Sequence, residues 1–436
     1  MFKIDGTCWL TPGEQREVVK LLLQNGLVVM DNGRKLPLKS GGTTDIYLNL
    51  RNMRNHPEAI RELANLYANP IRRLHVDRIV EVPEAVSPLA GHLSAILNIP
   101  IVTVRETAKT GRVVSGQLIG EVKFGESIVI VDDVVTDGAS KLAAIRELRA
   151  KGANIAAIVV LVDRQQGWKK TLAEAGYGDV PVWAGLTLHD VRAELIGSGL
   201  MQRCNPETEA KNPLIIALDG MDPEQALSLA DRLRPSGCIL KANDFLDTGN
   251  LNEIVAGLSV YGRVMVDGKW HDIPNTVANR CKRLLKTPPW AVTVHASGGR
   301  NMVAAAVNTL DGTKTIVLAV TLLTSIGDEC EEIFTRRPIG QVKKLAQMAY
   351  DAGARGFVCS TQEAAMLRKM FPEVTIVVPA LRSPDKDVQD QKRVGTFAGA
   401  QEAGASNYVG GRQFIQAPDP VAEINRVIKD ELHIEL

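Results

Sequence analysis

VMVDGKWHDIPNTV, residues 264–277, is the stretch that decides the fold, because an apolar run ends there in three charged side chains. The run VMV predicts a buried strand, and Asp267, Lys269 and Asp272 follow it closely. Side chains two positions apart on an extended strand share a face, so we expect Asp267 and Lys269 to point the same way. Pro274 then favours the start of a helix. The stretch therefore predicts one strand–helix unit with charge at its junction.

Seven further apolar runs between residues 213 and 436 have the same form, each followed by a helical pattern. They are PLIIAL from 213, CILKA from 238, AVTVH from 291, TIVLAV from 315, GFVC from 356, TIVVP from 375 and NYVGG from 407. The helix start signals include Asp222 with Gln225, Ser360 with Glu363, and Asp419 before a proline. Eight strand–helix units predict a (β/α)8 TIM barrel, with a doubly wound open sheet as the alternative.

The residues before this region also alternate between β-branched runs and helical patterns. The clearest strands are RIVEV from 78, IVTV from 101, SIVIVDD from 127 and AAIVVLVD from 156, with a helix expected over 137–151. This pattern predicts an α/β domain with an open sheet. The stretch GSGLMQRCNPETEAKNP, 197–213, has little periodicity and reads as a seam. We therefore expect an N-terminal domain over 1–200, a linker over 201–212 and the barrel over 213–436.

The composition is that of a globular protein without a specialised partner surface. The chain has 436 residues, of which 45% are hydrophobic and 23% charged, and its formal net charge is +1. No whole-chain field attracts nucleic acid or an anionic membrane, so we expect neither partner. The six cysteines lack C-x-x-C spacing and the seven histidines lack metal-binding spacing, so direct metal ligation by the protein is not expected. Without a signal-peptide pattern, the expected location is the cytoplasm.

Charged residues end three successive strands of the expected barrel: Asp219, Lys241, and the Asp267, Lys269 and Asp272 group. Catalytic groups of such barrels lie at the carboxyl ends of the strands, whereas a surface salt bridge is the alternative explanation. Neighbouring carboxylates keep a lysine protonated. Such a lysine can stabilise a developing carbanion and then protonate it. The pattern therefore suits decarboxylation without a metal.

DGKWHDIPNTV resembles the signature of the orotidine 5'-monophosphate decarboxylase family, and the resemblance covers 213–436. Its other segments are IIALD, VHASGG from 294, VTLLTS from 320, VVPALRSPDKDVQDQKRV from 377 and GGRQF from 410. The resemblance implies a charged array of Lys241, Asp267, Lys269 and Asp272, with Lys269 as the proton donor. The substrate contacts that it implies are Asp219, Thr276, Ser325, Pro379, Arg382, Gln391, Gly411 and Arg412.

Within that family Asp272 and Thr276 serve the active site of the neighbouring subunit, so the resemblance implies a homodimer with shared sites. Ser325 would contact the pyrimidine, while Gln391, Gly411 and Arg412 would bind the 5'-phosphate. The sequence departs from the family at Ala380, where glycine is common, and at Asn243, with Ala242 before it.

IVIVDDVVTDGAS, 128–140, joins a strand to a helix through two acids and a glycine-containing loop. Such a turn offers backbone N–H groups to a phosphate, although an ordinary βα connection is the alternative. The stretch resembles the phosphoribosyl-pyrophosphate motif of type I phosphoribosyltransferases. The residues that the resemblance assigns to ligand binding here are Asp132, Asp133, Thr136, Gly138 and Ser140.

The surrounding segments resemble the orotate phosphoribosyltransferase family: LPLKSGGTTDIYLNLR from 36, VPEAVSPLA from 82, VRETAKTGRVVSG from 104 and LVDRQQG from 161. They carry Lys39, Tyr47, Arg105 and Arg164 as implied substrate contacts, with Arg164 on the orotate carboxylate. Lys109 would be the catalytic lysine, reaching into the partner subunit. The resemblance implies Mg²⁺ bound with phosphoribosyl pyrophosphate. Glu106 and Asp137 are acidic where the family has a lysine and a small residue.

Together the halves resemble the bifunctional uridine 5'-monophosphate (UMP) synthases. The implied reactions join orotate to phosphoribosyl pyrophosphate and then decarboxylate the product, orotidine 5'-monophosphate, to UMP. Two alternatives remain open. In one, the N-terminal half is a degenerate binding or dimerising module beside an active decarboxylase. In the other, the barrel is a Mg²⁺-dependent sugar-phosphate enzyme of the same suprafamily.

Overall fold

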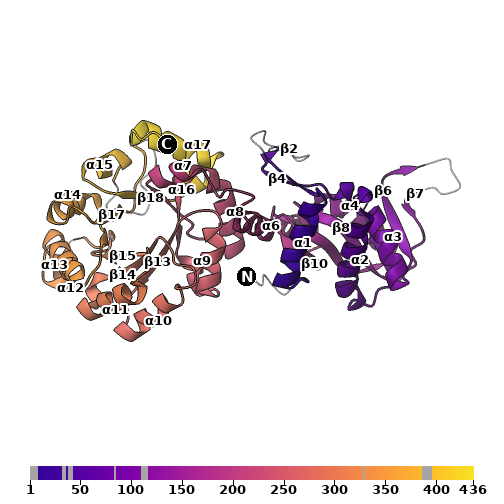
Figure 1. The fold of residues 1–436 in the computed structure, drawn as a ribbon, viewed down its shortest axis with the longest axis horizontal. Coiled ribbons are helices and arrows are strands. Elements are labelled where there is room, and N and C mark those ends of the chain that lie inside the picture. The colour runs from indigo at the N-terminus through magenta and orange to yellow at the C-terminus, as the bar shows by residue number, and fades with distance from the viewer. Residues whose placement is uncertain are drawn as a thin grey trace. The chain divides into compact units, whose positions relative to one another are not determined.

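The computed structural model describes residues 8–31, 36–37, 43–82, 85–109, 116–327, 329–384 and 395–436. The chain divides into two compact units, the first ending at Leu200 and the second spanning Met201–Leu436. Figure 1 labels many of the helices and strands of both units. Each unit has its own sheet and its own hydrophobic core.

The first unit is built on an open six-stranded sheet with the order β10-β9-β8-β5-β6-β7. Its strands are β5 (Arg78–Glu81), β6 (Ile101–Lys109), β7 (Gly116–Ile119), β8 (Ser127–Val135), β9 (Asn154–Asp163) and β10 (Val182–Thr187). All neighbours are parallel except β6 and β7. The four predicted strands are confirmed as β5, β6, β8 and β9. The edge strands β7 and β10 were not predicted, because short or half-exposed edge strands lack a continuous apolar run.

Helices and two short antiparallel ladders complete the first unit. The helices are α1 (Pro12–Gln24), η1 (Leu50–Asn55), α2 (Pro57–Arg72), α3 (Ser87–Leu97), α4 (Ala139–Ala150), α5 (Trp168–Glu174) and α6 (Leu188–Gly197). The ladders pair β1 (Val28–Met30) with β4 (Ile46–Leu48), and β2 (Leu36–Pro37) with β3 (Thr43–Thr44). The helix expected over 137–151 is α4. A buried arginine, Arg192 of α6, donates to both oxygens of Asp45 at 2.7 and 2.8 Å and so ties α6 to the turn between β3 and β4.

The second unit is a closed barrel of eight parallel strands in chain order. They are β11 (Leu214–Ala217), β12 (Ile239–Ala242), β13 (Val264–Trp270), β14 (Ala291–His295), β15 (Ile316–Val320), β16 (Gly356–Val358), β17 (Thr375–Val378) and β18 (Asn407–Gly410). All eight correspond to the predicted runs. Because β11 pairs with β18 as well as with β12, the sheet closes on itself and the open-sheet alternative is wrong.

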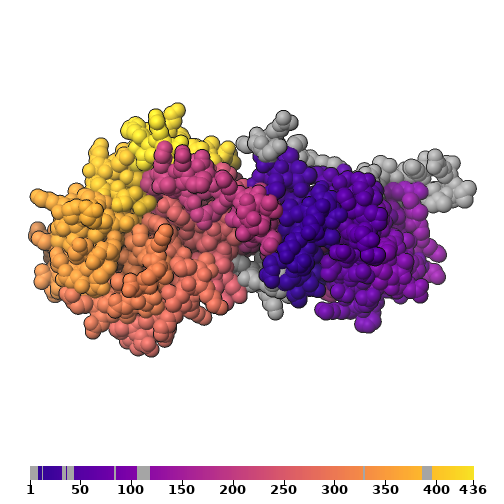
Figure 2. All heavy atoms as spheres, in the orientation of Figure 1, coloured from indigo at the N-terminus to yellow at the C-terminus, as the bar shows by residue number. Residues whose placement is uncertain are grey.

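Helices cover the outside of the barrel, and Figure 2 shows α13 and α14 on its surface in orange. The main ones are α8 (Pro223–Leu233), α9 (Leu251–Ser259), α10 (Pro274–Lys282), α11 (Arg300–Leu310), α12 (Cys330–Phe334), α13 (Pro338–Asp351), α14 (Thr361–Met370), α15 (Phe397–Glu402), α16 (Arg412–Ile415) and α17 (Pro420–Arg426). Short turns η2 (Arg234–Ser236), η3 (Asp244–Asp247), η4 (Ala296–Gly298) and η5 (Val427–Glu431) complete the set. The predicted start signals at Asp222, Ser360 and Asp419 are all N-caps. Among the described helices of both units, none is long and apolar enough to cross a membrane.

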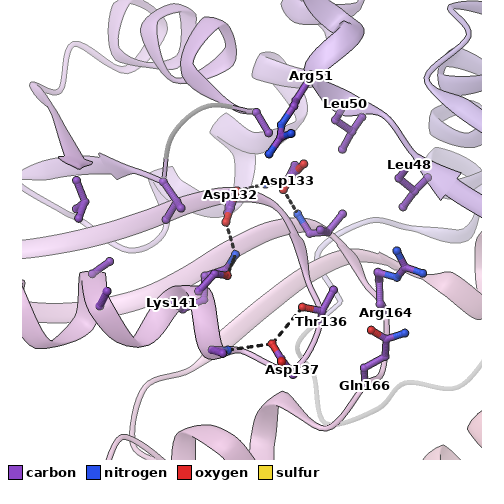
Figure 3. A pocket seen from close by; sticks show the side chains of 18 of the residues that line it. Leu48, Leu50, Arg51, Asp132, Asp133, Thr136, Asp137, Lys141, Arg164 and Gln166 are labelled. Atoms are coloured by element: carbon purple, nitrogen blue, oxygen red, sulfur yellow. Dashed lines mark hydrogen bonds and ion pairs between the residues drawn. The ribbon is translucent and has the colours of Figure 1, made fainter. Parts of the chain in front are cut away.

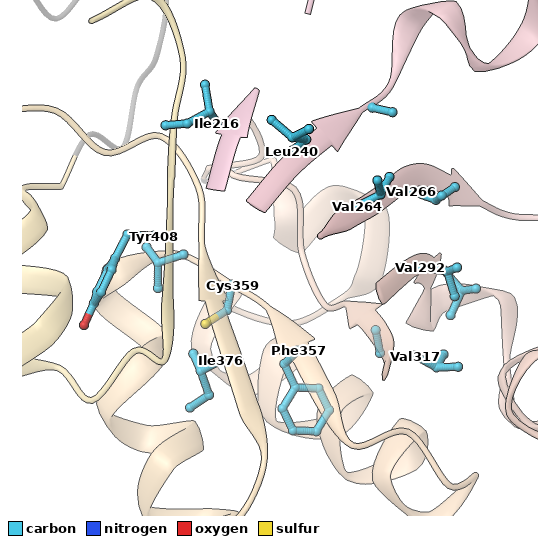
Figure 4. Close-up of a cluster of buried hydrophobic side chains, with 14 of the residues drawn as sticks. Ile216, Leu240, Val264, Val266, Val292, Val317, Phe357, Cys359, Ile376 and Tyr408 are labelled. Carbon is cyan, nitrogen blue, oxygen red and sulfur yellow. The ribbon is translucent and has the colours of Figure 1, made fainter. Parts of the chain in front are cut away.

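Side chains of the barrel strands alternate between two cores. Inside the barrel lie Ile215, Ile239, Met265, Ala291, Leu318, Val377 and Val409. The alternate residues of the strands pack outward against the helices, and Figure 4 shows Ile216, Leu240, Val266, Val292, Phe357, Ile376 and Tyr408 of that set. This alternation follows from the two-residue period of a strand. It assigns every second residue of each strand to the barrel interior.

The segment that follows Leu200 packs on the barrel. Helix α7 (Pro206–Lys211) carries Glu209, whose carboxylate accepts from Arg203 at 2.6 and 2.7 Å. Arg263, at the start of β13, donates to the carbonyls of Glu209 and Asn212 at 2.6 and 2.8 Å. These contacts hold the entry to β11 at a defined position.

Ala380 follows β17 with φ +65°, in the left-handed region that costs a residue with a Cβ about 1–2 kcal/mol. Glycine relieves this strain but loses more conformational entropy on folding. We predict that Ala380→Gly raises the free energy of unfolding of the barrel by a net amount of about 1 kcal/mol. The expected rise in Tm is about 2–4 °C for a unit of this size. Calorimetry of the full chain measures it. The matched control, Ala304→Gly inside α11, should lower the Tm instead. A lower Tm for both variants would contradict this account.

Candidate active sites

The carboxyl ends of the barrel strands surround a cavity of about 540 Å³. Eight of the predicted residues line it: Asp219, Lys241, Asp267, Lys269, Pro379, Arg382, Gly411 and Arg412. They come from the ends of β11, β12, β13, β17 and β18 and the loops that follow. The position agrees with the general rule that barrel sites form where the strands end.

The strand period explains why polar groups meet here. Lys241 lies two residues beyond Ile239, and Asp267 lies two residues beyond Met265, so both continue rows that face the barrel interior. Both side chains are almost fully buried, at 5% and 6% exposure. Charged groups so deep are stable only when they are paired. The barrel interior thus ends in a polar layer.

The paired groups form one continuous array. Lys241 Nζ lies 2.7 Å from Asp219 Oδ1 and 3.2 Å from Asp267 Oδ2. Lys269 Nζ lies 2.6 Å from the same Asp267 oxygen. Thr293 of β14 donates its hydroxyl to the other oxygen, Oδ1, at 2.9 Å. One carboxylate therefore binds two ammonium groups and a hydroxyl.

The protonation states follow from these contacts. Burial alone would lower the pKa of Lys241, but the charges of Asp267 and Asp219 outweigh it and raise that pKa above its usual value. Burial would raise the pKa of Asp267, but Lys241 and Lys269 outweigh it and lower that pKa. Lys241 is therefore an ammonium and Asp267 a carboxylate at neutral pH.

The backbone at Lys269 is not the extended strand that the spacing predicted. Lys269 has φ +42°, and the pairing of β13 with β14 shifts in register between Val266 and Trp270. The prediction that an extended backbone aligns Asp267 and Lys269 was wrong in its geometry. A bulge brings the two side chains into contact instead, and the ion pair forms across it.

Four of the predicted barrel residues are not among the described residues that line this cavity. Asp272 is exposed and accepts a hydrogen bond from the backbone N–H of Ile273 at 2.7 Å, while Thr276 lies in the first turn of α10. Ser325 is exposed, and its neighbour Thr324 lines the cavity. Gln391 lies outside the described residues. Sequence reasoning missed Thr293, because a threonine inside an apolar run looks like an ordinary β-former.

A polar network supports the arginine side of the cavity. Gln413, next to Arg412 in α16, accepts from Ser383 N at 3.0 Å and donates to Ser383 Oγ at 2.6 Å and to Glu423 at 2.8 Å. Arg426 of α17 donates to Ser383 Oγ at 2.9 Å and also pairs with Glu423 and Glu431. The loop that carries Arg382 is thereby tied to the short helix that begins at Arg412.

The first unit has a cavity of about 590 Å³ at the carboxyl end of β8. Seven of the predicted residues line it: Tyr47, Arg105, Asp132, Asp133, Thr136, Ser140 and Arg164. Figure 3 shows Asp132 and Asp133 on one side and Arg164 and Gln166 across from them. Lys39 lies outside the described residues, and so does the side chain of Lys109, whose backbone ends β6. The strand-to-helix turn therefore forms the floor of a built cavity.

The two adjacent acids have different surroundings. Asp132 is buried and pairs with Lys141, which is itself 3% exposed and lies on α4 (Figure 3). Among the described residues, no lysine forms an ion pair with Asp133. Burial, together with the neighbouring charge of Asp132, raises the pKa of Asp133 to about 7. One acid is thus ion-paired within the protein, and the other is poised to titrate. Sequence reasoning missed Lys141, since a lysine in a helix is usually solvated.

In the loop before α4, an acidic side chain already accepts hydrogen bonds from groups of the loop. Asp137 accepts from the backbone N–H of Ala139 at 3.1 Å and from the Thr136 hydroxyl at 3.3 Å (Figure 3). Gly138 caps the helix with φ +82°, and an added Cβ would lie 3.2 Å from Trp168. The glycine is therefore required by backbone conformation and packing, while Asp137 takes one N–H that a phosphate would use.

Among the described residues, no group of three or more potential ligands is arranged to hold a metal ion directly. The donors in this cavity that fit a hydrated cation are the carboxylates of Asp132 and Asp133. They suit Mg²⁺, which keeps several of its waters and binds through one or two carboxylates.

The raised pKa of Asp133 predicts a pH-dependent stability. Because the folded unit holds this proton up to about pH 7 and the unfolded chain releases it near pH 4, stability falls as pH rises between those values. The slope from one proton is at most about 1.4 kcal/mol per pH unit. In Asp133→Asn this fall should disappear, as measured by urea unfolding of the full chain from pH 5 to 7.

Asp179→Asn is the control for that measurement. Asp179 is an exposed acid of the same unit, and its hydrogen bond from Arg149 lowers its pKa, so it titrates below the window. An identical pH slope for wild type and Asp133→Asn would show that Asp133 is ionised throughout.

Comparison with known proteins matches each unit to a family. Residues 212–427 match the orotidine 5'-phosphate decarboxylase / HUMPS family, and residues 49–184 match the phosphoribosyl transferase domain. The orotidine 5'-phosphate decarboxylase of Chromobacterium violaceum is 40% identical over 230 residues, which are 51% of this chain and 93% of that protein.

Solved structures similar to parts of the chain include the following two enzymes. The UMP synthase of Leishmania donovani is 34% identical with a TM-score of 0.39, and the match covers 44% of this chain and 40% of that one. The orotate phosphoribosyltransferase of Aeropyrum pernix is 26% identical with a TM-score of 0.36, covering 42% of this chain and 99% of that one.

The family assignment rests on the matched sequences, and the geometry of both cavities agrees with it. The decarboxylase match begins at residue 212, beside the entry to β11, and contains the whole charged array. The phosphoribosyl transferase match contains β8 and its acid pair. The chain therefore belongs to the orotidine 5'-phosphate decarboxylase family, and it joins that decarboxylase domain to a phosphoribosyl transferase domain in one polypeptide.

Proposed function

We propose that this chain carries out the last two steps of UMP synthesis. Its first unit joins orotate to phosphoribosyl pyrophosphate, and its second decarboxylates the resulting orotidine 5'-monophosphate. The observation that carries the proposal is the ion-paired array of Lys241, Asp267 and Lys269 at the barrel mouth, in a chain that also has a phosphoribosyl transferase domain. The domain limits of 1–200, 201–212 and 213–436 belong to this proposal.

In the barrel, the substrate carboxylate would lie next to Asp267, whose charge the two lysines maintain. Repulsion between the two carboxylates favours loss of carbon dioxide, and the electron pair of the broken C–C bond stays on the pyrimidine carbon. Lys269 stabilises that carbanion as an ammonium and then transfers a proton to it. Solvent later returns the proton to the lysine amine. Apart from that solvent proton, these steps use only side chains of the chain itself.

The rest of the cavity would hold the nucleotide. Asp219 and Lys241 bind the ribose hydroxyls, and Ser325 or its cavity-lining neighbour Thr324 contacts the pyrimidine. The 5'-phosphate lies against Gly411 and Arg412, where a glycine backbone and a guanidinium suit an anion. Pro379, Arg382 and Gln391 complete the enclosure in this proposal.

In the first unit, an orotate nitrogen bonds to C1 of the sugar as the C1–oxygen bond to pyrophosphate breaks, and the proton of that nitrogen passes to solvent. Asp132 and Asp133 receive the ribose hydroxyls, while Thr136, Gly138 and Ser140 hold the 5'-phosphate. Arg164 and Tyr47 bind orotate, with Lys39, Arg105 and Lys109 on the pyrophosphate side. When bound, Mg²⁺ neutralises charge on the departing pyrophosphate.

The functional form is a cytoplasmic homodimer in this proposal. Asp272 is exposed beside Ile273, an apolar side chain that is 66% exposed, and Thr276 follows on α10. A second barrel placed over this segment would bury Ile273 and receive Asp272 at its own active site. Lys109 would act across subunits in the same way.

Two matched variants of the full chain test the two-step function. With orotate, phosphoribosyl pyrophosphate and Mg²⁺, wild type should consume the orotate chromophore and form UMP. Lys269→Ala should slow decarboxylation at least about 10²-fold and accumulate orotidine 5'-monophosphate, because its proton donor is gone. The double variant Asp132→Asn/Asp133→Asn should lose the first step and still decarboxylate added orotidine 5'-monophosphate. Chromatography of the nucleotides reads out both.

Chelation separates the two activities without any substitution. We expect EDTA to stop consumption of orotate, since phosphoribosyl pyrophosphate needs Mg²⁺, and to leave decarboxylation of orotidine 5'-monophosphate unchanged. Loss of both activities would favour a metal-dependent sugar-phosphate enzyme. If wild type decarboxylates but never consumes orotate, the first unit is a binding or dimerising module, and Glu106 and Asp137 become the residues to replace.

A further inference from the structure

Thr293 is the one side chain that touches both ends of the Asp267–Lys269 segment among the described contacts. Its hydroxyl donates to Asp267 Oδ1 at 2.9 Å and accepts from the backbone N–H of Lys269 at 2.9 Å. The side chain is fully buried on β14, two residues beyond Ala291 of the barrel interior. A hydroxyl can donate once and accept at the same time, so both bonds are compatible.

The backbone that Thr293 binds is strained. Lys269 has φ +42° in a bulge, a conformation that costs a residue with a Cβ about 1–2 kcal/mol. Gly268 makes the bulge possible, because an added Cβ there would lie 2.3 Å from the Trp270 ring nitrogen. A buried N–H left without an acceptor would disfavour this conformation further. The Thr293 oxygen supplies that acceptor.

The same hydroxyl also binds one oxygen of the Asp267 carboxylate and leaves the other oxygen to the two lysines. It occupies Oδ1 of Asp267, while Oδ2 receives Lys269 Nζ at 2.6 Å and Lys241 Nζ at 3.2 Å. Without the hydroxyl, the carboxylate could rotate and pair one oxygen with each lysine. That rotation would move the Lys269 ammonium relative to the cavity.

We propose that Thr293 is a positioning residue for decarboxylation, holding the Lys269 backbone in its left-handed conformation and fixing the rotation of the Asp267 carboxylate. The inference rests on the function proposed above. Packing alone does not call for a hydroxyl, since the residue paired with Thr293 on β15 is Leu318, an apolar side chain of the barrel interior. Valine has nearly the shape of threonine and would fill the same space.

The test compares four variants of the full chain by steady-state kinetics with orotidine 5'-monophosphate. Thr293→Val keeps the shape and removes the hydroxyl, and we expect kcat to fall about 10²-fold with little change in KM. Thr293→Ser keeps the hydroxyl and should stay close to wild type, whereas Thr293→Ala, its partner in size, should resemble valine. Thr315→Val is the control, because Thr315 donates to the Pro289 carbonyl at the start of β15, away from the cavity.

The inference is overturned if Thr293→Val keeps the wild-type kcat, or if serine is as slow as alanine. It is also overturned if Thr315→Val slows the enzyme as much as Thr293→Val. Should the valine variant fail to fold, the serine and alanine pair decides the matter, since they differ only by the hydroxyl.

Hydrogen exchange at the Lys269 amide separates this inference from the proposed function. We expect slow exchange in wild type and Thr293→Ser, and faster exchange in Thr293→Ala. Equal exchange rates in all three would mean that the Thr293 hydroxyl does not hold the Lys269 backbone. If the wild-type chain shows slow exchange but does not decarboxylate orotidine 5'-monophosphate, the proposed function is refuted, and with it the role of Thr293 in decarboxylation.

Discussion

Closure of the eight-stranded sheet is the constraint on which the barrel site depends. A closed barrel has one interior, and each strand must send every second side chain into it. The lower rows are apolar, with Ile239 and Met265 among them, while the rows end in Lys241, Asp267 and Thr293. The charged array is therefore the last layer of the same stacking that makes the core. Its side chains meet because the strands are neighbours, although they are far apart in sequence.

Because the layer is buried, the charge of each of its residues depends on the charges of the others. A carboxylate at the position of Asp267 would be protonated in an apolar interior, and a lysine at 241 would lose its proton. Each reverses the effect of burial on the pKa of the other. Removing one charge would leave its partner uncompensated, which is far more costly than removing a surface ion pair. The array thus behaves as one unit, and the free-energy contribution of one of its residues cannot be separated from those of the others.

Much of the barrel could be predicted because its signals are local. Each strand is a short apolar run between turn signals, and the caps at Asp222, Ser360 and Asp419 lie within a few residues of the helices they begin. The strand-end charges of Asp219, Lys241 and Asp267 could be found in the same way. The bulge at Lys269 could not, since it depends on the pairing of β13 with β14. Asp272, Thr276 and Gln391 keep their roles as predictions.

Both units have a buried acid paired with a lysine, but the second titratable group beside that pair differs between them. In each unit this acid lies near the carboxyl end of a strand and is paired with a buried lysine: it is Asp267 in the barrel and Asp132 in the first unit. In the barrel, the second lysine is exposed to the cavity and remains available to a substrate. In the first unit, Lys141 lies in a helix behind the acid, and the second carboxyl, Asp133, is left with a pKa of about 7. An incoming cation would lower that pKa and ionise the group, so the site gains its charge as it is filled. The barrel site is charged in advance, which the proposed repulsion of a substrate carboxylate requires.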